Sequence, residues 1–401
     1  MMAHKFKMTE IGPIPEEWEL RRIDTSFDFV GNNTFARESM LSVGEVVNIH
    51  YGDVLIKYGA NVDVSSDSVM FLDSSIRTTA NHALQSGDIV MADTAEDETA
   101  GKCCEIIGAE NKQVEAGLHT FVLRPRDKYA PKFLGYAFNA ECYHNQLIPL
   151  MQGTKVTSIS KGAVGSTFLI CPSYTEQESI ANALSDIDNL IRNLQSLIAK
   201  KLDIKRGVMQ QLLSGNKRLR GFTKPWVEKK LGEITPDIYQ PETISQDQFT
   251  ASGYPVYGAN GRIGYYDRYN HETEQILVTC RGSSCGSVNF TMGKCWITGN
   301  AMVINLDKVI DKYDKYFLFY LLVYNDLTML ITGSGQPQIV RKPLLDYTLC
   351  IPPTLTEQTA ISSLLSSMGN EIEVLESKKA KYESIKQGMM QELLTGKIRL
   401  L

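Results

Sequence analysis

The sequence lacks the features that mark membrane, secreted and metal-dependent proteins. Its 401 residues contain no run of about 18 apolar residues, so we expect no membrane span. The N-terminal stretch MMAHKFKMTEIGPIPEEW has no apolar core of a secretory signal, which favours the cytoplasm. The eight cysteines form no CxxC pair and are expected to be reduced and mostly buried. A zinc site from Cys280, Cys285 and Cys295 is conceivable, but their spacing matches no finger or ribbon, and we expect no metal.

Motifs for catalysis and nucleotide binding are also missing. The chain has no GxxxxGK[ST] loop and no HExxH. GSGQP at Gly333 lacks the third glycine of a dinucleotide-binding turn and does not open a βαβ unit. We therefore expect no catalytic residue and no cofactor in this chain.

Positive charge is scarce overall but concentrated in one place. The net charge of −5 argues against a nucleic-acid partner, because phosphate contacts need Lys and Arg. Between Lys200 and Lys230, however, basic residues far outnumber the two acidic ones, Asp203 and Glu228. This basic band is either a solvated helix end with its linker or a surface that faces nucleic acid.

What the sequence does have is a long internal repeat. TEQESIANALSDIDNLIRNL begins at Thr175, and TEQTAISSLLSSMGNEIEVL begins 181 positions later at Thr356. The identities continue without a gap to Gly215 and Gly396, which predicts two helices of about forty residues, with Thr175 and Thr356 as N-caps and the glycines as C′ residues.

The apolar residues of both copies alternate in steps of three and four, which is typical of a coiled-coil seam. We expect the two helices to pair with each other, antiparallel, across a pseudo-twofold axis. The alternative is two separate helices, each docked on its own domain. The seam residues are Leu184, Ile187, Ile191, Leu194, Ile198, Leu365, Met368, Ile372 and Leu375.

A globular segment precedes each helix. Strand-like runs are expected at 53–56, 88–91, 120–123, 275–278 and 301–304, and helices at 131–145 and 312–330. The sequence thus predicts an α+β protein with two α/β domains on a duplicated plan. We expect domain 1 at 1–172, the first long helix at 173–216, domain 2 at 217–353 and the second long helix at 354–401.

The candidate binding residues are polar, aromatic and basic side chains on loops. The Gly-rich stretch from Tyr254 to Tyr269 is either a hairpin whose tyrosines pack on a sheet or a turn that presents Asn and Arg, the side chains that read adenine and guanine edges. The acidic loop 93–98 is expected to face away from DNA. In domain 1 the candidates are Lys57, Tyr58, Lys102, Lys155, Thr157, Ser158 and Lys161. In domain 2 they are Tyr257, Asn260, Arg262, Tyr265, Arg281, Ser283, Gln336, Gln338, Arg341 and Lys342.

These stretches resemble a known family, the DNA-specificity (S) subunits of type I restriction-modification systems. The resemblance is carried by TEIGPIPEEW at Thr9, the two helices that begin with TEQ, their endings KRGVMQQLLSGNKRLRGF and IKQGMMQELLTGKIRL, and YGANGRIGYY. It implies a non-catalytic reader of double-stranded DNA, with two target-recognition domains that each bind one half of a bipartite sequence. It also implies two methyltransferase (M) subunits, which carry S-adenosylmethionine, and restriction (R) subunits as partners.

Two other classes of function stay open at this point. A coiled-coil scaffold whose globular domains bind protein predicts no salt-dependent DNA binding, whereas a DNA reader predicts a steep salt dependence. A stand-alone nuclease or methyltransferase predicts turnover by the chain alone. If the helices set the separation of two half-sites, lengthening both by whole heptads should lengthen the unread spacer between them.

Overall fold

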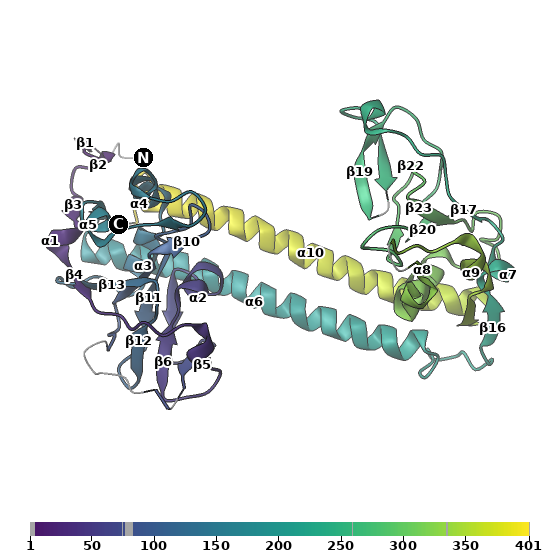
Figure 1. Cartoon of the computed structure of the whole chain (residues 1–401), viewed down its shortest axis with the longest axis horizontal. Coiled ribbons are helices and arrows are strands. Elements are labelled where there is room, and N and C mark those ends of the chain that lie inside the picture. The colour runs from purple at the N-terminus through teal and green to yellow at the C-terminus, as the bar shows by residue number, and fades with distance from the viewer. Residues whose placement is uncertain (1–4, 74, 77–82, 259, 334–335, 401) are drawn as a thin grey trace. The chain divides into compact units, whose positions relative to one another are not determined.

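The structure of the chain, a computed structural model, describes residues 5–73, 75–76, 83–258, 260–333 and 336–400 (Figure 1). Two compact units divide the chain. Unit 1 comprises Met1–Leu194 with Lys378–Leu401, and unit 2 comprises Gln195–Ser377. No helix in the described ranges is long and apolar enough to cross a membrane.

Unit 1 is built on two sheets. The larger has the order β4-β13-β9-β11-β7, formed by Phe27–Val30 (β4), Thr120–Pro125 (β13), Ile89–Ala92 (β9), Cys103–Ile107 (β11) and Asn61–Asp63 (β7). The smaller has the order β12-β6-β8-β5, formed by Gln113–Ala116 (β12), Val46–Ile49 (β6), Phe71–Leu72 (β8) and Met40–Leu41 (β5). The two sheets pack together through a shared core of small apolar residues, among them Val47, Ile49, Val90, Ile106 and Val122.

A second core in unit 1 joins the larger sheet to helices. It contains apolar side chains of α3 (Phe133–Phe138), α4 (Glu141–Leu147) and the start of the long helix α6 (Tyr174–Leu213). The remaining elements are β1 (Phe6–Thr9), β2 (Gly12–Pro15), β3 (Glu19–Arg22), α1 (Ile23–Ser26), η1 (Arg37–Ser39), α2 (Tyr51–Ile56), β10 (Thr94–Ala95), η3 (Ile148–Leu150), β14 (Thr157–Ser158), α5 (Lys161–Gly165) and β15 (Phe168–Cys171).

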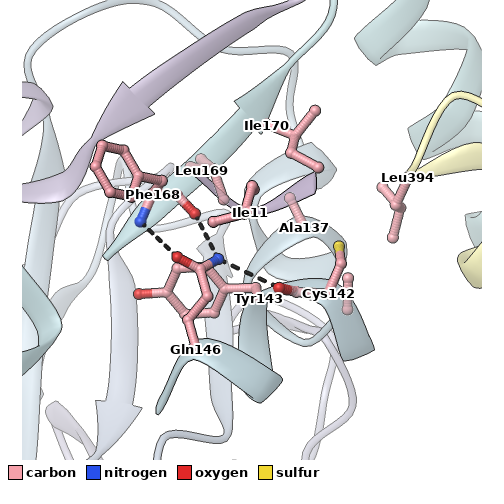
Figure 2. Close-up of a pocket in the computed structure, with 10 residues that line it drawn as sticks. Ile11, Ala137, Cys142, Tyr143, Gln146, Phe168, Leu169, Ile170 and Leu394 are labelled. Carbon is pink, nitrogen blue, oxygen red and sulfur yellow. Dashed lines mark hydrogen bonds between the residues drawn. The ribbon is translucent and has the colours of Figure 1, made fainter. Parts of the chain in front are cut away.

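Gln146 ties α4 to β15 inside this core, as Figure 2 shows. Its Nε2 donates to the carbonyl oxygens of Cys142 (3.2 Å) and Phe168 (2.9 Å), and its Oε1 accepts from the Phe168 amide (2.9 Å). The pocket beside it, which Tyr143 and Leu394 help to line, has a volume of about 10 Å³. That is room for about one water molecule, so this pocket is a packing defect rather than a ligand site.

Unit 2 repeats the plan with fewer strands. Its sheets have the orders β17-β23-β20-β21 and β19-β18-β22. The strands are β16 (Val227–Lys230), β17 (Ile238–Tyr239), β18 (Tyr254–Gly258), β19 (Gly261–Tyr266), β20 (Ile276–Thr279), β21 (Val288–Phe290), β22 (Trp296–Ile297), β23 (Ala301–Ile304) and β24 (Thr348–Ile351). The helices are α7 (Leu231–Ile234), η4 (Gln246–Gln248), α8 (Lys315–Asn325), η5 (Leu327–Leu330), α9 (Arg341–Asp346) and the long α10 (Leu355–Leu393).

Strand pairing confirms that the two units share one plan. In unit 1 β9 pairs antiparallel with β13, and in unit 2 β20 pairs antiparallel with β23. Outside these sheets, β3 pairs with β15 and β16 with β24, so each unit ties its entry strand to the strand before a long helix. The mixed α/β architecture predicted from the sequence is therefore confirmed.

Some predicted elements are wrong in type or extent. Residues 53–56, predicted as a strand, lie in helix α2, which His50 caps by accepting from the Gly52 amide at 3.1 Å. A short apolar run fits either structure, and the cap decides it. The helix predicted over 131–145 is two helices, α3 and α4, and the one predicted over 312–330 is α8 followed by the 3₁₀ turn η5.

Both long helices are present, with 40 residues in α6 and 39 in α10. Their predicted ends are confirmed, because Gly215 and Gly396 have φ of +71° and +73°, the left-handed conformation of a C′ glycine. The predicted N-caps are wrong. Thr175 lies inside the first turn, and the hydroxyl that accepts from the Glu176 amide is that of Ser173, at 3.3 Å.

The seam is buried and the helices pair antiparallel within each unit. In unit 1 Lys386 of α10 forms a 2.6 Å ion pair with Asp188 of α6, and in unit 2 Lys201 of α6 forms one with Glu371 of α10, also at 2.6 Å. Within unit 1 the early part of α6 thus lies beside the late part of α10, and within unit 2 the order is reversed. Met368 and Leu375 are half-buried, and the buried seam residues are Leu184, Ile187, Ile191, Leu194, Ile198, Leu365 and Ile372.

Candidate nucleic-acid interface

Each unit anchors the start of a long helix with the same three-residue contact, here called the Trp–Glu–Arg clamp. In unit 1 Glu176 accepts from the Trp18 indole (2.9 Å) and from two guanidinium nitrogens of Arg399 (2.5 and 2.8 Å). Arg399 also lies over the Trp18 ring, 5.2 Å from its centroid. The carboxylate is therefore both desolvated and fully paired, which makes the contact sensitive to removal of any member.

The clamp of unit 2 is built from the corresponding residues. Glu357 accepts from two guanidinium nitrogens of Arg218, both at 2.6 Å, and from the Trp226 indole at 3.3 Å. Arg218 and Arg399 are 181 positions apart (399 − 218), the same offset as the helices. Sequence reasoning missed the clamp, although that shared offset was a signal that could have revealed it. Part of the basic band therefore closes the fold, since Arg218 belongs to it.

In each unit two loops that carry candidate residues lie side by side. One is the turn before α5 or α9, and the other follows β9 or β20. In unit 1 Gln152 and Ser158 exchange backbone hydrogen bonds (3.0 and 2.8 Å), and β14 pairs with β10 in the loop after β9. In unit 2 Thr332 and Gln338 exchange the same bonds (2.8 and 2.9 Å), and Gln338 bridges Arg281 after β20. We call these two places the turn surfaces of units 1 and 2.

A glycine fixes the shape of each turn. Gly153 has φ of +108° and Gly333 has φ of +90°, a region that side chains with a Cβ rarely adopt. A Cβ on Gly153 would overlap the carbonyl oxygen of Val156, and one on Gly333 would come within 2.6 Å of that of Gln336. Gly153 and Gly333 thus take a backbone conformation that a larger residue would strain.

The turn surfaces carry eight of the 17 predicted binding residues in exposed positions. In unit 1 Lys155 and Ser158 are exposed, Thr157 is half-buried, and Lys161 is exposed at the start of α5. Lys161 Nζ lies 5.6 Å from the centre of the Phe121 ring. The exposed residues of unit 2 are Arg281, Ser283, Gln336, Gln338 and Lys342. Such cations and amides can position phosphates and contact base edges.

Four of the predicted binding residues are buried or make hydrogen bonds within their own unit. Burial lowers the pKa of Lys102, whose Nζ donates to the Leu55 carbonyl, and burial raises the pKa of the Tyr58 phenol. Arg341 donates to the carbonyls of Ile238 and Pro236, and the buried Tyr257 hydroxyl accepts from the Met292 amide at 3.3 Å. These side chains support the surface rather than extend from it.

Lys57 and Tyr58 belong to a different place in unit 1 from the turn surface. Lys57 is exposed and lies over the Tyr58 ring at 5.5 Å. Tyr58 and Lys102 line a pocket of about 400 Å³ together with Asn139, His144 and Lys386. The structure therefore splits the unit 1 candidates into two groups.

The hairpin of β18 and β19 fits both interpretations of the Gly-rich stretch. Tyr254 packs edge-on against Tyr269, and Tyr266 packs against Trp296, as a structural role predicts. At its tip Asn260 and Arg262 are exposed, and Arg262 lies 5.3 Å from the centre of the half-buried Tyr265 ring. The tip therefore remains available for contact.

The acidic loop 93–98 lies next to the turn surface of unit 1, because β10 belongs to it. Asp93 accepts from the Thr94 hydroxyl at 2.7 Å, and its carbonyl accepts from the Ile159 amide. Hydrogen bonds from Thr99 lower the pKa of Asp97. The acidic loop therefore borders the turn that carries Lys155.

The structure does not bring the conceivable zinc ligands together as one site. Cys280 and Cys285 lie in the core cluster shared with α8, and Cys295 lies in a separate cluster with Ile297. Across the described ranges no group of three or more His, Cys, Asp or Glu side chains is arranged to hold a metal ion.

Comparison with known proteins agrees with this geometry. The family described as "Type I restriction modification DNA specificity domain" matches residues 223–384. A putative type I restriction enzyme MjaX specificity subunit from Methanocaldococcus jannaschii is 26% identical, over 98% of this chain and 97% of that one. The MjaVIII specificity subunit from the same organism is 28% identical over 62% of this chain and 66% of its own length.

Solved structures share the fold. The S subunit of a type I restriction-modification system from M. genitalium superposes with a TM-score of 0.65 at 17% identity, covering 98% of this chain and 99% of that one. A chain from a study of complex assembly and conformational transition of the type I R-M system has a TM-score of 0.55 at 18% identity, covering 96% and 99%. Over nearly its whole length the chain is therefore similar to specificity subunits of type I restriction-modification systems, and residues 223–384 match their DNA specificity domain.

Proposed function

We propose that the chain reads a bipartite DNA sequence, with unit 1 reading one half and unit 2 the other, and carries out no chemistry itself. The observation that supports this most is the pair of turn surfaces. Each is held by the same backbone bridge, and each presents a different set of side chains, Lys155, Thr157 and Ser158 in one and Arg281, Gln336 and Gln338 in the other. Two half-sites of different sequence require different contacting side chains, and the same backbone turn presents such a different set in each unit.

We infer the partner proteins from the similarity to type I specificity subunits. Two methyltransferase subunits and the restriction subunits would do the chemistry, and S-adenosylmethionine would bind in the methyltransferase subunits. The net charge of −5 fits such a division, because partners can supply part of the phosphate contact that an acidic chain lacks. The cations of the turn surfaces then position the duplex locally, and the amides beside them contact bases.

An exchange of segments tests this proposal. Replacing residues 217–352 with the matching segment of another family member should change one half-site and leave the other and the spacer unaltered. The measurement is the methylated sequence in genomic DNA from a host that carries the exchanged chain and its methyltransferase.

A matched exchange serves as the control. Replacing only 174–213 and 355–393, the two long helices, from the same relative should leave both half-sites unchanged. If the exchange of 217–352 altered both half-sites, the units would not read DNA independently.

A further inference from the structure

The larger sheet of unit 1 has one strand more than its counterpart in unit 2, and it lies at the edge. β11 and β21 correspond, because each pairs antiparallel with the equivalent central strand, Glu105 opposite Ile89 and Phe290 opposite Ile276. In unit 1 β7 pairs parallel with the outer side of β11. In the described part of unit 2 no strand pairs with the outer side of β21.

In unit 1 β7 and the residues before it cover the face of α3. Val62 is fully buried, and a Cβ on Gly135 of α3 would overlap the Ala60 carbonyl oxygen, so this stretch lies directly on the helix. Glu105 of β11 accepts from the amides of Lys132 (2.7 Å) and Gly135 (2.9 Å). The first turn of α3 is thereby closed from both sides.

Unit 2 has aromatic side chains at the corresponding place. Phe290, which corresponds to Glu105, contacts the rings of Tyr316 and Phe319 with centroid separations of 4.8 and 5.3 Å. Phe319 corresponds to Gly135, because each precedes a tyrosine that contacts an equivalent serine of a long helix, Tyr136 to Ser185 and Tyr320 to Ser366. The helix face itself stays open, because Tyr316, Val323 and Tyr324 are 42%, 43% and 36% exposed.

The outer edge of β21 also has backbone groups with which no strand of the described residues pairs. The Thr279 amide donates to the Ser287 carbonyl, and the Thr291 amide donates to the Gln275 carbonyl. Because inward and outward groups alternate along an antiparallel strand, the N–H and C=O groups of Val288 and Phe290 point away from β20. An exposed edge beside exposed aromatics is a template for another strand, and proteins usually cover it.

We propose that an extended segment of a partner protein pairs parallel with β21 and packs across Tyr316, Phe319 and Val323, in the place that β7 takes in unit 1. Charges of both signs border the face, because Lys205 Nζ lies 5.6 Å from the centre of the Tyr320 ring and Glu274 accepts from the Tyr316 hydroxyl at 3.3 Å. Outward N–H and C=O groups along a strand edge pair with a second peptide backbone, which DNA does not have, so a protein strand with an apolar central residue, like Val62 in β7, is the better fit.

The inference rests on the fold and is independent of how the turn surfaces read DNA. Unit 1 fills its own edge, so this partner segment would bind at unit 2 alone. A partner present in two copies would therefore engage the chain unequally.

Hydrogen exchange in the intact chain tests the proposal. The amides of Val288 and Phe290 should exchange quickly in the chain alone. They should slow at least tenfold when either the methyltransferase subunit or the restriction subunit is added, each tested separately. The proposal fails if neither protein slows them, if they are already slow in the chain alone, if DNA alone slows them, or if slowing depends only on the concentration of the chain, which would indicate a second copy.

Variants separate docking from folding. Val288→Pro removes an outward N–H, and Val323→Arg places a charge on the open face. Both should weaken binding of the protein that protects β21 at least tenfold while thermal unfolding stays close to wild type. Ile310→Arg is the control, since Ile310 is 59% exposed in the loop before α8, and it should bind normally. Equal loss with Ile310→Arg, or no loss with Val323→Arg, would overturn the proposal.

Discussion

Units 1 and 2 begin their late helices α3 and α8 in chemically different ways, although the clamps at α6 and α10 are nearly identical. α8 is capped by its own Asp314, which accepts from the Phe317 amide at 2.7 Å. α3 begins after Lys132, which has φ of +71° and no capping side chain, and Glu105 from the neighbouring strand supplies the acceptor. The repeat has kept the contacts that close the long helices and changed those that shape each recognition unit.

The difference has an energetic side. In unit 1 the buried carboxylate of Glu105 contacts the start of α3, whereas in unit 2 the ring of Phe290 contacts the rings of α8. Burial raises the pKa of Glu105 to about 7, because removing the carboxylate from water disfavours its charged form more than the three backbone amides restore it. Unit 1 therefore carries a pH-sensitive group at a place where unit 2 has none.

The largest effect is expected from breaking a clamp. Glu176→Ala should lower the free energy of unfolding of unit 1 by about 3–5 kcal/mol, because Arg399, whose side chain is 5% exposed, loses its buried partner and keeps Glu17, which is 75% exposed. Glu357→Ala should cost less in unit 2, since the Arg218 side chain is 22% exposed and can reach water. Native-state hydrogen exchange of β9 and β13 against β20 and β23 measures the two units separately.

Two variants control this prediction. Arg206→Ala removes an exposed pair with Asp203 and should change the unfolding free energy by no more than about 0.5 kcal/mol. Adding Arg399→Ala to Glu176→Ala should restore part of the loss, because no buried charge then stays unpaired. If the double variant lost as much unfolding free energy as Glu176→Ala and Arg399→Ala lose together, the two residues would not be energetically coupled, and the clamp prediction would be wrong.

A smaller expected effect is a pH dependence of stability in unit 1 that unit 2 does not share. Since the folded pKa of Glu105, about 7, lies above the ordinary 4.5, its stabilising contribution is complete below pH 4.5 and is lost as the pH rises through 7. Unit 1 should lose a few kcal/mol between pH 5 and pH 8, because one pKa unit corresponds to about 1.4 kcal/mol. Glu105→Gln should remove most of that dependence, as measured by hydrogen exchange in β9 and β13 at both pH values.

Unit 2 and a second buried acid of unit 1 serve as controls for this pH dependence. Strands β20 and β23 of unit 2 should not follow this pH dependence, since Phe290 stands where Glu105 does in unit 1. Glu115→Gln changes another buried acid of unit 1 and should leave the dependence in place. A wild-type unit 1 that was equally stable at pH 5 and pH 8 would show that the carboxylate is better solvated than its burial implies.

The sequence predicted the features that depend on local pattern and missed those that depend on tertiary contact. Apolar runs predicted β9, β13, β20 and β23, and the three-four spacing predicted the long helices. The run at 53–56 was misread because its three apolar residues, 54–56, are too few to distinguish strand from helix. Nothing local indicates that Lys102, Arg341 and Tyr257 are taken up by the fold, because their partners lie far away in sequence.

The smallest effect concerns how each turn surface meets DNA. Arg281 has a planar guanidinium, which can bind a guanine edge in two places, and it lies beside Gln338. Lys155 is a point charge with no such geometry, and the acidic loop 93–98 pairs with the neighbouring strand β14. With methyltransferase present, Lys155→Ala should weaken binding equally on all sequences, by about 1 kcal/mol or less, and reduce the slope of log affinity against log salt by about 0.9.

Arg281→Ala should instead lose discrimination, because only this side chain of the two can prefer one base over another. Binding to the target should fall by about 1–3 kcal/mol, and binding to unrelated duplex by much less. Lys312→Ala, an exposed cation of unit 2 outside the turn surface, is the matched control and should change neither slope nor discrimination. If Lys312→Ala lowered the salt slope while Lys155→Ala and Arg281→Ala left it alone, the DNA would lie on a different face of the units, and the turns would have only a structural role.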